Sequence, residues 1–416
     1  MRRGLARATV ALALVVTGCT AQAQPAPFTV GAIYPLSGSQ GPGGVDEHRG
    51  VLLAAELANA DGGVDGRPIE VRSIDVGSAD AAPAAIEQLH GDGVDVVLGS
   101  YGSTISAPAS LATAARHMLF WETGAVGTLP MGADSGALTF RVPPTGGTLG
   151  RNAIAFTADR LARGLGRDPG SLRYAVSFVD DVYGRSVADG ARAELAARGL
   201  DLVGSVGYDL QTFDAGAVAA RIARLRPDVL FVSAYLDDAV AMRRALVRRR
   251  VPLLASIGTS SSYCMPAFGA TLGADAVGLF ASDKPSAKAI DPAGLAPEAA
   301  ALLARADTAY RERYDESMSP AGLAGFSAAW ALFHDVLPAS VELTPDGIAD
   351  AALGQDLPRG SLPNGSGLRF GRPGEPGAGD NLQAASVIWE WVHPGHAEVV
   401  WPPVFATTPV RPMDIG

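Results

Sequence analysis

The sequence predicts an α/β fold in which parallel sheets carry helices on both faces. From residue 28 onward, extended apolar runs alternate with longer Ala-rich segments of helical periodicity. Strand–helix units of this length place consecutive strands parallel to one another and bury both faces of each sheet. A chain of 416 residues that is 48% hydrophobic can also bury more than one core, so two domains are expected.

The elements follow in a regular order. Strands are expected at 28–34, 69–76, 94–98, 118–121, 172–179, 202–208, 229–233 and 253–257, and helices at 46–60, 81–90, 105–116, 148–165, 186–198, 215–225, 238–249, 298–314 and 322–337. The Pro- and Gly-rich segment 141–147 separates two strand–helix series and predicts a crossing between lobes. A second crossing is expected near Lys284, because the two long helices that follow do not continue the second series. The strand-like run 385–391 then joins one of the sheets, and 358–379 and 402–416 are expected to be loop or tail.

The N-terminus has the pattern of an export signal. A basic start at 1–7 precedes a short apolar run at 8–16, which is too short to cross a membrane that needs about 20 apolar residues. The following Val-Thr-Gly-Cys at 16–19 resembles a bacterial lipobox, in which the cysteine is lipidated. We therefore expect lipidation of Cys19, with conventional cleavage near Ala21 or Ala23 as the alternative. Lipidation would leave Cys264 without a partner, so no structural disulfide is expected.

Charge and motif content exclude several classes of protein. Lys and Arg number 33 against 43 Asp and Glu, which disfavours binding to nucleic acid or to anionic membranes. The chain has no Gly-x-Ser-x-Gly elbow, no phosphate-binding loop and no zinc-ligand pattern. His393 and His396 lie in a Pro/Gly turn and are interpreted as part of a solvated loop. The sequence therefore predicts neither an enzyme nor a metal site nor a cofactor.

An ordered set of motifs carries a family resemblance. Tyr-Pro-Leu-Ser-Gly at 34–38, the Gly/Asp-rich turn at 59–67, Val-Leu-Gly-Ser at 97–100 and Asp-Val-Tyr-Gly at 181–184 occur in that order. Together they closely resemble the type I periplasmic solute-binding proteins, and within them the leucine/isoleucine/valine-binding family of ABC-transporter receptors. The resemblance extends from residue 28 to about residue 282 and more weakly to residue 391.

The resemblance implies a two-lobed fold with a three-strand hinge and a ligand between the lobes. Each lobe is then discontinuous in sequence. Residues 25–143 with 284–375 are expected to form lobe 1, and 144–283 with 376–405 to form lobe 2. Residues 1–24 would be signal and tether, and 406–416 a tail.

The expected site begins after the third strand. Ser103 or Thr104 is expected to cap the next helix, whose N-terminus favours an anion. The resemblance implies that Ser103 holds the carboxylate of the ligand, whereas a cap that serves only its own helix is the alternative. Thr123 and Gly124 fall in the family loop that contacts the ligand amine. Beside them, Glu122 is either an ammonium contact or a solvated rim charge.

From the second lobe, Tyr183 and Tyr235 match tyrosines that line the family cleft, although ordinary packing is the alternative for each. Ser260 or Ser261 stands where amino-acid binders of the family carry an acid. Because an unpaired buried ammonium is unfavourable, an amide, a urea-like molecule or an organic acid is expected unless Glu122 or Asp181 compensates. Gly43 stands in place of a family aromatic, which implies room for a different or larger solute.

Taken together, these features predict an extracytoplasmic, lipid-anchored solute-binding protein. Its partners would be a small polar solute and the permease of an ABC importer, with a membrane contact only through the lipid on Cys19. The chain is expected to act as a monomer. The alternative is a sensor of the same fold that reports the ligand to a regulatory partner.

Overall fold

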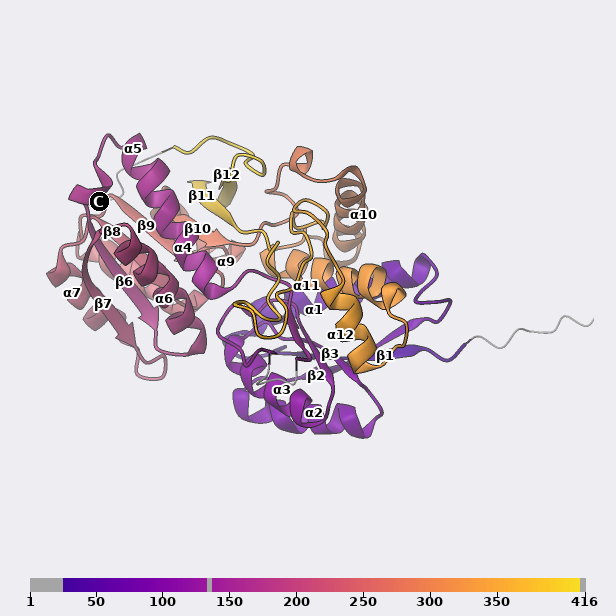
Figure 1. Ribbon diagram of the computed structural model, residues 1–416. Helices are drawn as coiled ribbons and strands as arrows, with labels where there is room; N and C mark the ends of the chain where they lie inside the picture. Colours follow the sequence, from indigo (N-terminus) through magenta and orange to yellow (C-terminus); the bar gives the residue numbers. More distant parts are fainter. Residues whose placement is uncertain (1–24, 133–136, 412–416) are drawn as a thin grey trace, which may run out of the picture.

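The computed structural model describes residues 25–132 and 137–411, which form two lobes of sheet and helix (Figure 1). The first lobe contains a parallel five-stranded sheet in the order β2-β1-β3-β4-β5. Its strands are β1 (Phe28–Tyr34), β2 (Ile69–Asp75), β3 (Val96–Gly99), β4 (Leu119–Glu122) and β5 (Thr139–Arg141). The two-lobed α/β fold is thus confirmed. The predicted lobe boundaries stay a prediction.

Helices cover both faces of the first sheet. Its face toward α2 (Ala82–Gly91) and α3 (Ser103–Ala115) buries Ile33, Val97 and Phe120. The opposite face buries the neighbouring residues of the same strands, such as Ala32 and Trp121, beneath α1, α11 and α12. These helices span α1 (Gly41–Ala60), α11 (Pro320–Trp330) and α12 (Pro345–Leu353), and α10 (Pro297–Tyr314) packs beside α1. Alternate residues of each strand therefore enter different cores.

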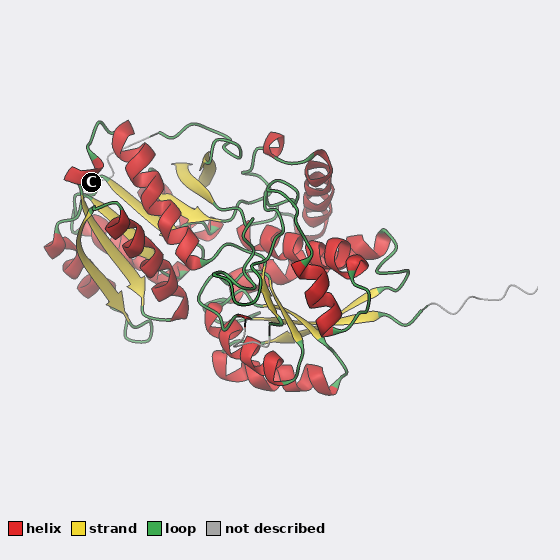
Figure 2. Ribbon diagram, viewed as in Figure 1, coloured by secondary structure: helices red, strands yellow, loops and turns green. Residues whose placement is uncertain are grey.

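The second lobe contains a seven-stranded sheet in the order β12-β11-β10-β9-β8-β6-β7. Figure 2 draws the strands of both lobes in yellow. Strand β11 runs antiparallel to β10 and β12, and the other pairs are parallel. The strands are β6 (Arg173–Val179), β7 (Asp201–Tyr208), β8 (Val229–Ser233), β9 (Ala255–Thr259), β10 (Phe280–Asp283), β11 (Val387–His393) and β12 (His396–Trp401). The helices are α4 (Gly146–Phe156), α5 (Ala162–Gly164), α6 (Val182–Ala197), α7 (Ala215–Leu225), α8 (Leu236–Arg248) and α9 (Pro266–Leu272). The strand-like run near residue 385 thus joins the second sheet.

The chain passes between the lobes three times, at 142–145, 284–286 and 382–386. In the described chain, none of these crossings is a strand, which differs from the expected three-strand hinge. Pro143, Pro144 and Pro285 lack the backbone N–H that a ladder requires. A single parallel bridge between Arg141 and Asp380 joins the ends of the first and third crossings. The hinge is consequently a set of extended connections and not a small sheet.

The predicted export signal and Cys19 lie outside the described residues. Within the residues that are described, no helix is both long and apolar enough to span a membrane.

Candidate functional site

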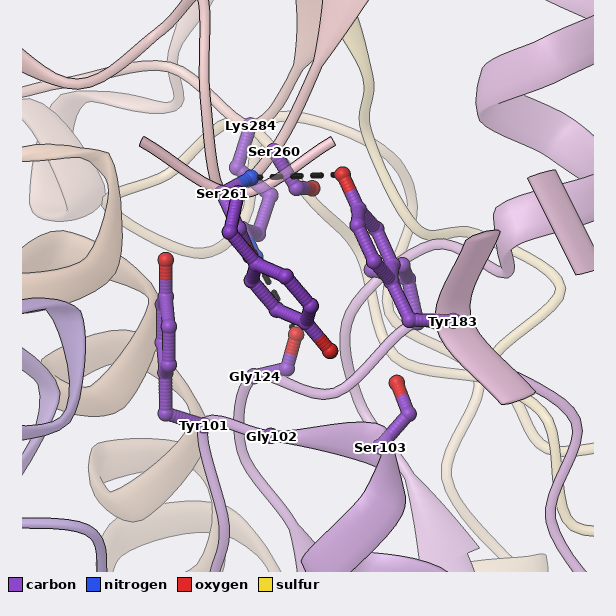
Figure 3. Close-up of a pocket in the computed structure, with 10 residues that line it drawn as sticks. Tyr101, Gly102, Ser103, Gly124, Tyr183, Ser260, Ser261 and Lys284 are labelled. Atoms are coloured by element: carbon purple, nitrogen blue, oxygen red, sulfur yellow. Dashed lines mark hydrogen bonds between the residues drawn. The ribbon is translucent and has the colours of Figure 1, made fainter. Parts of the chain in front are cut away.

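A narrow cavity lies between the two lobes (Figure 3). It has a volume of about 260 Å³, which includes space open to solvent. Its lining comes from the loops after β3 and β4, the start of α6, the loops after β8 and β9, and the second crossing: Tyr101, Gly102, Ser103, Gly124, Val126, Tyr183, Tyr235, Ser260, Ser261 and Lys284. Loops at the carboxyl ends of parallel strands are where open α/β sheets bind ligands. This cavity is therefore the candidate solute site.

The N-terminus of α3 opens into the cavity without a side-chain cap. Gly102 is the N-cap residue, and no side-chain cap hydrogen bond is made to the backbone at the start of the helix. The expectation that Ser103 or Thr104 caps α3 is therefore wrong, because Ser103 is the first helical residue. The Oγ1 atom of Thr104 accepts a hydrogen bond from Gln40 Nε2 at 3.1 Å and lies outside the lining.

Ser103 is buried, with 3% of its surface exposed, and its Oγ atom accepts a hydrogen bond from the Gly127 amide at 2.9 Å. Because the oxygen is an acceptor in that bond, the hydroxyl proton is free to be donated to another group. Figure 3 shows the Ser103 hydroxyl directed toward the side of the cavity that carries Tyr183 and Ser261. The hydroxyl and the start of α3 together form a site suited to an anionic group.

Two tyrosines of the second lobe face the start of α3. The rings of Tyr183 and Tyr235 lie 5.5 Å apart between centroids. The Tyr183 hydroxyl lies 2.9 Å from Thr259 Oγ1, and the Tyr235 hydroxyl donates to Asp181 Oδ2 at 2.7 Å. Asp181 also accepts from the Gly184 amide as the N-cap of α6. The carboxylate of Asp181 is therefore already hydrogen-bonded on both oxygens.

An acid that the sequence analysis missed lies behind Ser260. The Ser260 hydroxyl donates to Asp283 Oδ1 at 2.6 Å, and the Cys264 thiol donates to Asp283 Oδ2 at 2.8 Å. Asp283 is 1% exposed and does not line the cavity. Both of its oxygens are occupied, so Ser260 presents the cavity with a hydroxyl whose proton is already committed.

The only charged side chain among the described residues that line the cavity is Lys284. It is 2% exposed, and its Nζ donates to the Gly124 carbonyl oxygen at 3.1 Å. Lys284 Nζ also forms an ion pair with Asp283 Oδ1 at 3.8 Å. The contact with Gly124 ties the second crossing to the first lobe. Lys284 is one of only two lysines in the chain, the other being Lys288.

Gly124 is held between Lys284 and the buried carboxyl group of Glu47. A Cβ atom on Gly124 would lie 1.7 Å from Glu47 Oε2, so a larger residue does not fit. Glu47 Oε1 accepts a hydrogen bond from Thr123 Oγ1 at 2.7 Å, and Thr123 also lies 2.6 Å from the Tyr34 hydroxyl. Burial raises the pKa of Glu47 to about 7, while the Lys284 charge opposes the rise. Thr123 is thus part of this buried network and not of the cavity lining.

Glu122 is fully buried, so of its two predicted alternatives the solvated rim charge is wrong. Its Oε1 atom accepts hydrogen bonds from the Gly124 and Ala125 amides at 2.8 and 2.7 Å, which fixes the loop that forms the cavity floor. Burial raises its pKa to about 8, and the nearby Glu47 charge raises it further in the same direction. Glu122 does not line the cavity.

The expected extra room at Gly43 is filled by Tyr101. A Cβ atom on Gly43 would lie 2.1 Å from Tyr101 Cζ, so the ring packs directly against this glycine. The Tyr101 hydroxyl reaches Met265 Sδ of the second lobe at 3.7 Å. The expectation of a roomier cleft is therefore wrong, because an aromatic ring from a different loop occupies the space.

Of the nine predicted ligand residues, six line the cavity: Ser103, Gly124, Tyr183, Tyr235, Ser260 and Ser261. Thr104, Glu122 and Thr123 do not. The sequence analysis did not single out Tyr101, Gly102, Val126 or Lys284 as site residues. A signal for Lys284 existed, since a rare lysine stands at the predicted second crossing. No group of metal-ligating residues occurs in the described part of the chain.

Two lobes that enclose a cavity at their strand ends define a solute-binding protein of the clamshell class. Residues 27–376 match the model of the periplasmic binding protein family, and the chain belongs to that family. Membership confirms the expected class of protein, a binding protein without catalysis.

The chain is similar to several known members. It is 28% identical to the Leu/Ile/Val-binding protein homolog 8 of Brucella suis biovar 1 over 414 residues, or 99% of each chain. An extracellular ligand-binding receptor from Rhodopseudomonas palustris HaA2 superposes with a TM-score of 0.75 at 17% identity, covering 90% of this chain and 100% of that one. The LivJ protein of Streptococcus pneumoniae in complex with isoleucine superposes with a TM-score of 0.71 at 19% identity and the same coverage. The two structural likenesses show a shared fold.

Proposed function

We propose that this protein is the extracytoplasmic receptor of an ABC importer and that its cleft captures a small solute bearing a carboxylate. One observation carries the proposal: the start of the 13-residue helix α3, free of any side-chain cap, meets the Ser103 hydroxyl and two tyrosines of the opposite lobe in one cavity. Backbone N–H groups at a helix start favour an anion, and tyrosine rings provide apolar area with a polar edge.

The solute would act by shifting an open–closed equilibrium. Residues of both lobes line the cavity, so a solute that contacts both stabilises the closed form in proportion to its differential affinity. Because the cavity lies between the lobes, a solute would enter it as the lobes part. The permease would then recognise the closed form.

The names of the relatives support this proposal and give the first solutes to test. One relative is named for leucine, isoleucine and valine, and one solved structure of the same fold holds isoleucine. We further propose that a lipid on Cys19 holds the protein at the membrane as a monomer. A sensor role differs only in the partner, and permease and ATPase genes beside this gene would favour transport.

Thermal-shift screening of the purified protein tests the proposal. The panel contains leucine, isoleucine, valine, their 2-oxo and 2-hydroxy acid counterparts, small amides and urea. A solute at one hundred times its dissociation constant stabilises the folded state by about 2.7 kcal/mol, a shift of several degrees. At least one carboxylate is expected to raise the melting temperature. Stabilisation by amides or urea alone, with no carboxylate active, would contradict a carboxylate receptor.

A further inference from the structure

Lys284 is the one charged side chain among the described residues that line the cavity. The described residues that line the cavity include no acid, since Asp283, Glu47 and Glu122 all lie behind it. An ammonium group has three N–H donors, and Lys284 Nζ gives one of them to the Gly124 carbonyl oxygen. Lys284 Nζ also forms an ion pair with Asp283 Oδ1 at 3.8 Å, and the Asp283 oxygens accept hydrogen bonds from Ser260 and Cys264.

The position of the Lys284 ammonium group is also specific. It donates to Gly124, in the loop that the family resemblance assigns to the amine of an amino-acid ligand. Figure 3 shows Lys284 reaching from the side of Ser260 and Ser261 toward Gly124. A ligand ammonium at this carbonyl would lie beside a second buried cation, and like charges in a buried site repel strongly.

We propose that Lys284 replaces the ammonium group of the ligand, so that the cleft selects small carboxylates whose neighbouring carbon carries no ammonium. The suitable class is a 2-oxo acid, a 2-hydroxy acid or an unsubstituted carboxylate. The carboxylate would bind at Ser103 and the start of α3, and the adjacent oxygen would accept a hydrogen bond from Lys284. This inference rests on the proposed function, because it assumes that the cavity binds a carboxylate.

The proposed selection against ligands with an ammonium group can be tested with matched carboxylates that differ only in the substituent on the carbon next to the carboxylate. Calorimetric titration of the purified protein would use leucine, 4-methyl-2-oxopentanoate, 2-hydroxy-4-methylpentanoate and 4-methylpentanoate, with the corresponding sets for alanine and phenylalanine. At least one acid without an ammonium group is expected to bind tenfold or more tightly than its amino-acid counterpart. If amino acids bind as tightly as all their counterparts, the inference is overturned while the proposed function stands. If no compound in any set binds, the carboxylate receptor itself is refuted, and the inference fails with it.

Two lysine variants distinguish a role of Lys284 in ligand selection from a purely structural role. Lys284→Met keeps the length of the side chain and removes its charge, and it is expected to shift the ratio of affinities toward the amino acid by at least tenfold. Lys288→Met is the matched control, because Lys288 is exposed and lies outside the cavity lining, and its ratio is expected to equal that of the wild type. A Lys284→Met protein that melts at a lower temperature but keeps the wild-type ratio would show that Lys284 only ties the hinge to the first lobe.

Discussion

The backbone groups around Ser103 leave its hydroxyl proton available for a hydrogen bond to a solute. The Gly127 amide occupies one lone pair of Oγ, and the α3 start beside it carries no side-chain cap. Both features leave hydrogen-bond donors at the cavity that a solute can accept.

Ser103→Ala is expected to weaken binding of a carboxylate solute about tenfold to hundredfold. The change removes one hydrogen bond to a charged group, which contributes roughly 1.5–3 kcal/mol. Ser110→Ala is the control, because this buried serine of the same helix donates to the Ala107 carbonyl and lies outside the lining. Equal dissociation constants for wild type and Ser103→Ala in calorimetry would leave Ser103 with a structural role alone.

Glu122 makes folding stability depend on pH. Its folded pKa of about 8 lies above the ordinary value of 4.5, because burial favours the neutral form. Between these two values the unfolded chain has released the proton and the folded chain has kept it. Stability is therefore complete below pH 4.5 and is lost as pH rises toward 8.

Glu122→Gln is expected to remove this loss, because an amide oxygen can accept the same two backbone hydrogen bonds without titrating. Relative to wild type, the variant should become progressively more stable in urea unfolding from pH 5 to pH 8. Glu87→Gln serves as control, since Arg116 lowers the pKa of this exposed glutamate and it titrates below that range. If the free energy of unfolding of the wild type and of Glu122→Gln changes in parallel from pH 5 to pH 8, Glu122 is not a buried neutral carboxyl group.

Sequence patterns could identify the site residues that lie inside family motifs. They could not identify the residues that reach the site through the connections between the lobes. Ser103, Gly124 and Tyr183 sit at fixed distances from strand ends, so a family motif is enough to find them. Lys284 reaches the cavity, and Asp283 lies behind Ser260, only because the second crossing passes at this point. That geometry depends on how two lobes meet, which no local spacing records.

At the scale of elements, each lobe contains a pair of helices in backbone contact. Helices α1 and α11 meet at Gly50, where a Cβ atom would lie 2.1 Å from the Gly322 carbonyl oxygen. Helices α4 and α6 meet in the same way, and a Cβ atom on Gly190 would lie 2.3 Å from the Gly147 carbonyl oxygen. Glycine weakens an isolated helix, but here it permits a close packing that a side chain would prevent.

Gly50→Ala is expected to destabilise the protein by about 1–3 kcal/mol, because the added methyl group forces α1 and α11 apart. The matched control is Gly91→Ala at the end of α2, where nothing lies within 4 Å of the new Cβ atom and helix propensity favours alanine by up to about 1 kcal/mol. Denaturant titration would compare the two. A Gly50→Ala protein as stable as Gly91→Ala would contradict backbone packing between the helices.

Periodicity located the eight predicted strands and nine predicted helices to within a few residues, with α1 as the main exception. Helix α1 begins at Gly41 and not at residue 46, since contacts with Tyr101 and Pro35 stabilise a glycine-rich turn of low propensity. The sequence analysis missed strands β5, β10 and β12 and helices α9 and α12. Of these, β5 and β10 are only three and four residues long and fully buried. Such short runs carry no alternation that separates a strand from a loop.

At the scale of the whole molecule, the lobes touch at contacts that closure would make and opening would break. Tyr101 meets Met265 across the cleft, and Lys284 joins the second crossing to Gly124. The three connections between the lobes contain no continuous ladder that would resist a change of angle. The architecture is therefore suited to hinge motion, in which a few loop residues absorb the change.

Cys19→Ser is expected to release the protein from membranes into the soluble fraction while solute binding stays unchanged, because the anchor would precede the fold. Cell fractionation with salt and carbonate washes, followed by calorimetry on the released protein, makes the comparison. Persistence of the Cys19→Ser protein in the washed membrane pellet would show that the anchoring prediction is wrong.

The location of the solute site is tested most directly by a crystal structure of the protein with the tightest-binding carboxylate from the titrations. We expect the carboxylate within hydrogen-bond distance of Ser103 Oγ and the first amides of α3, with Lys284 Nζ beside the adjacent carbon. A solute bound elsewhere, for example in the hollow lined by Trp389, Trp391 and Lys288, would contradict the assignment of the cleft between the lobes as the binding site.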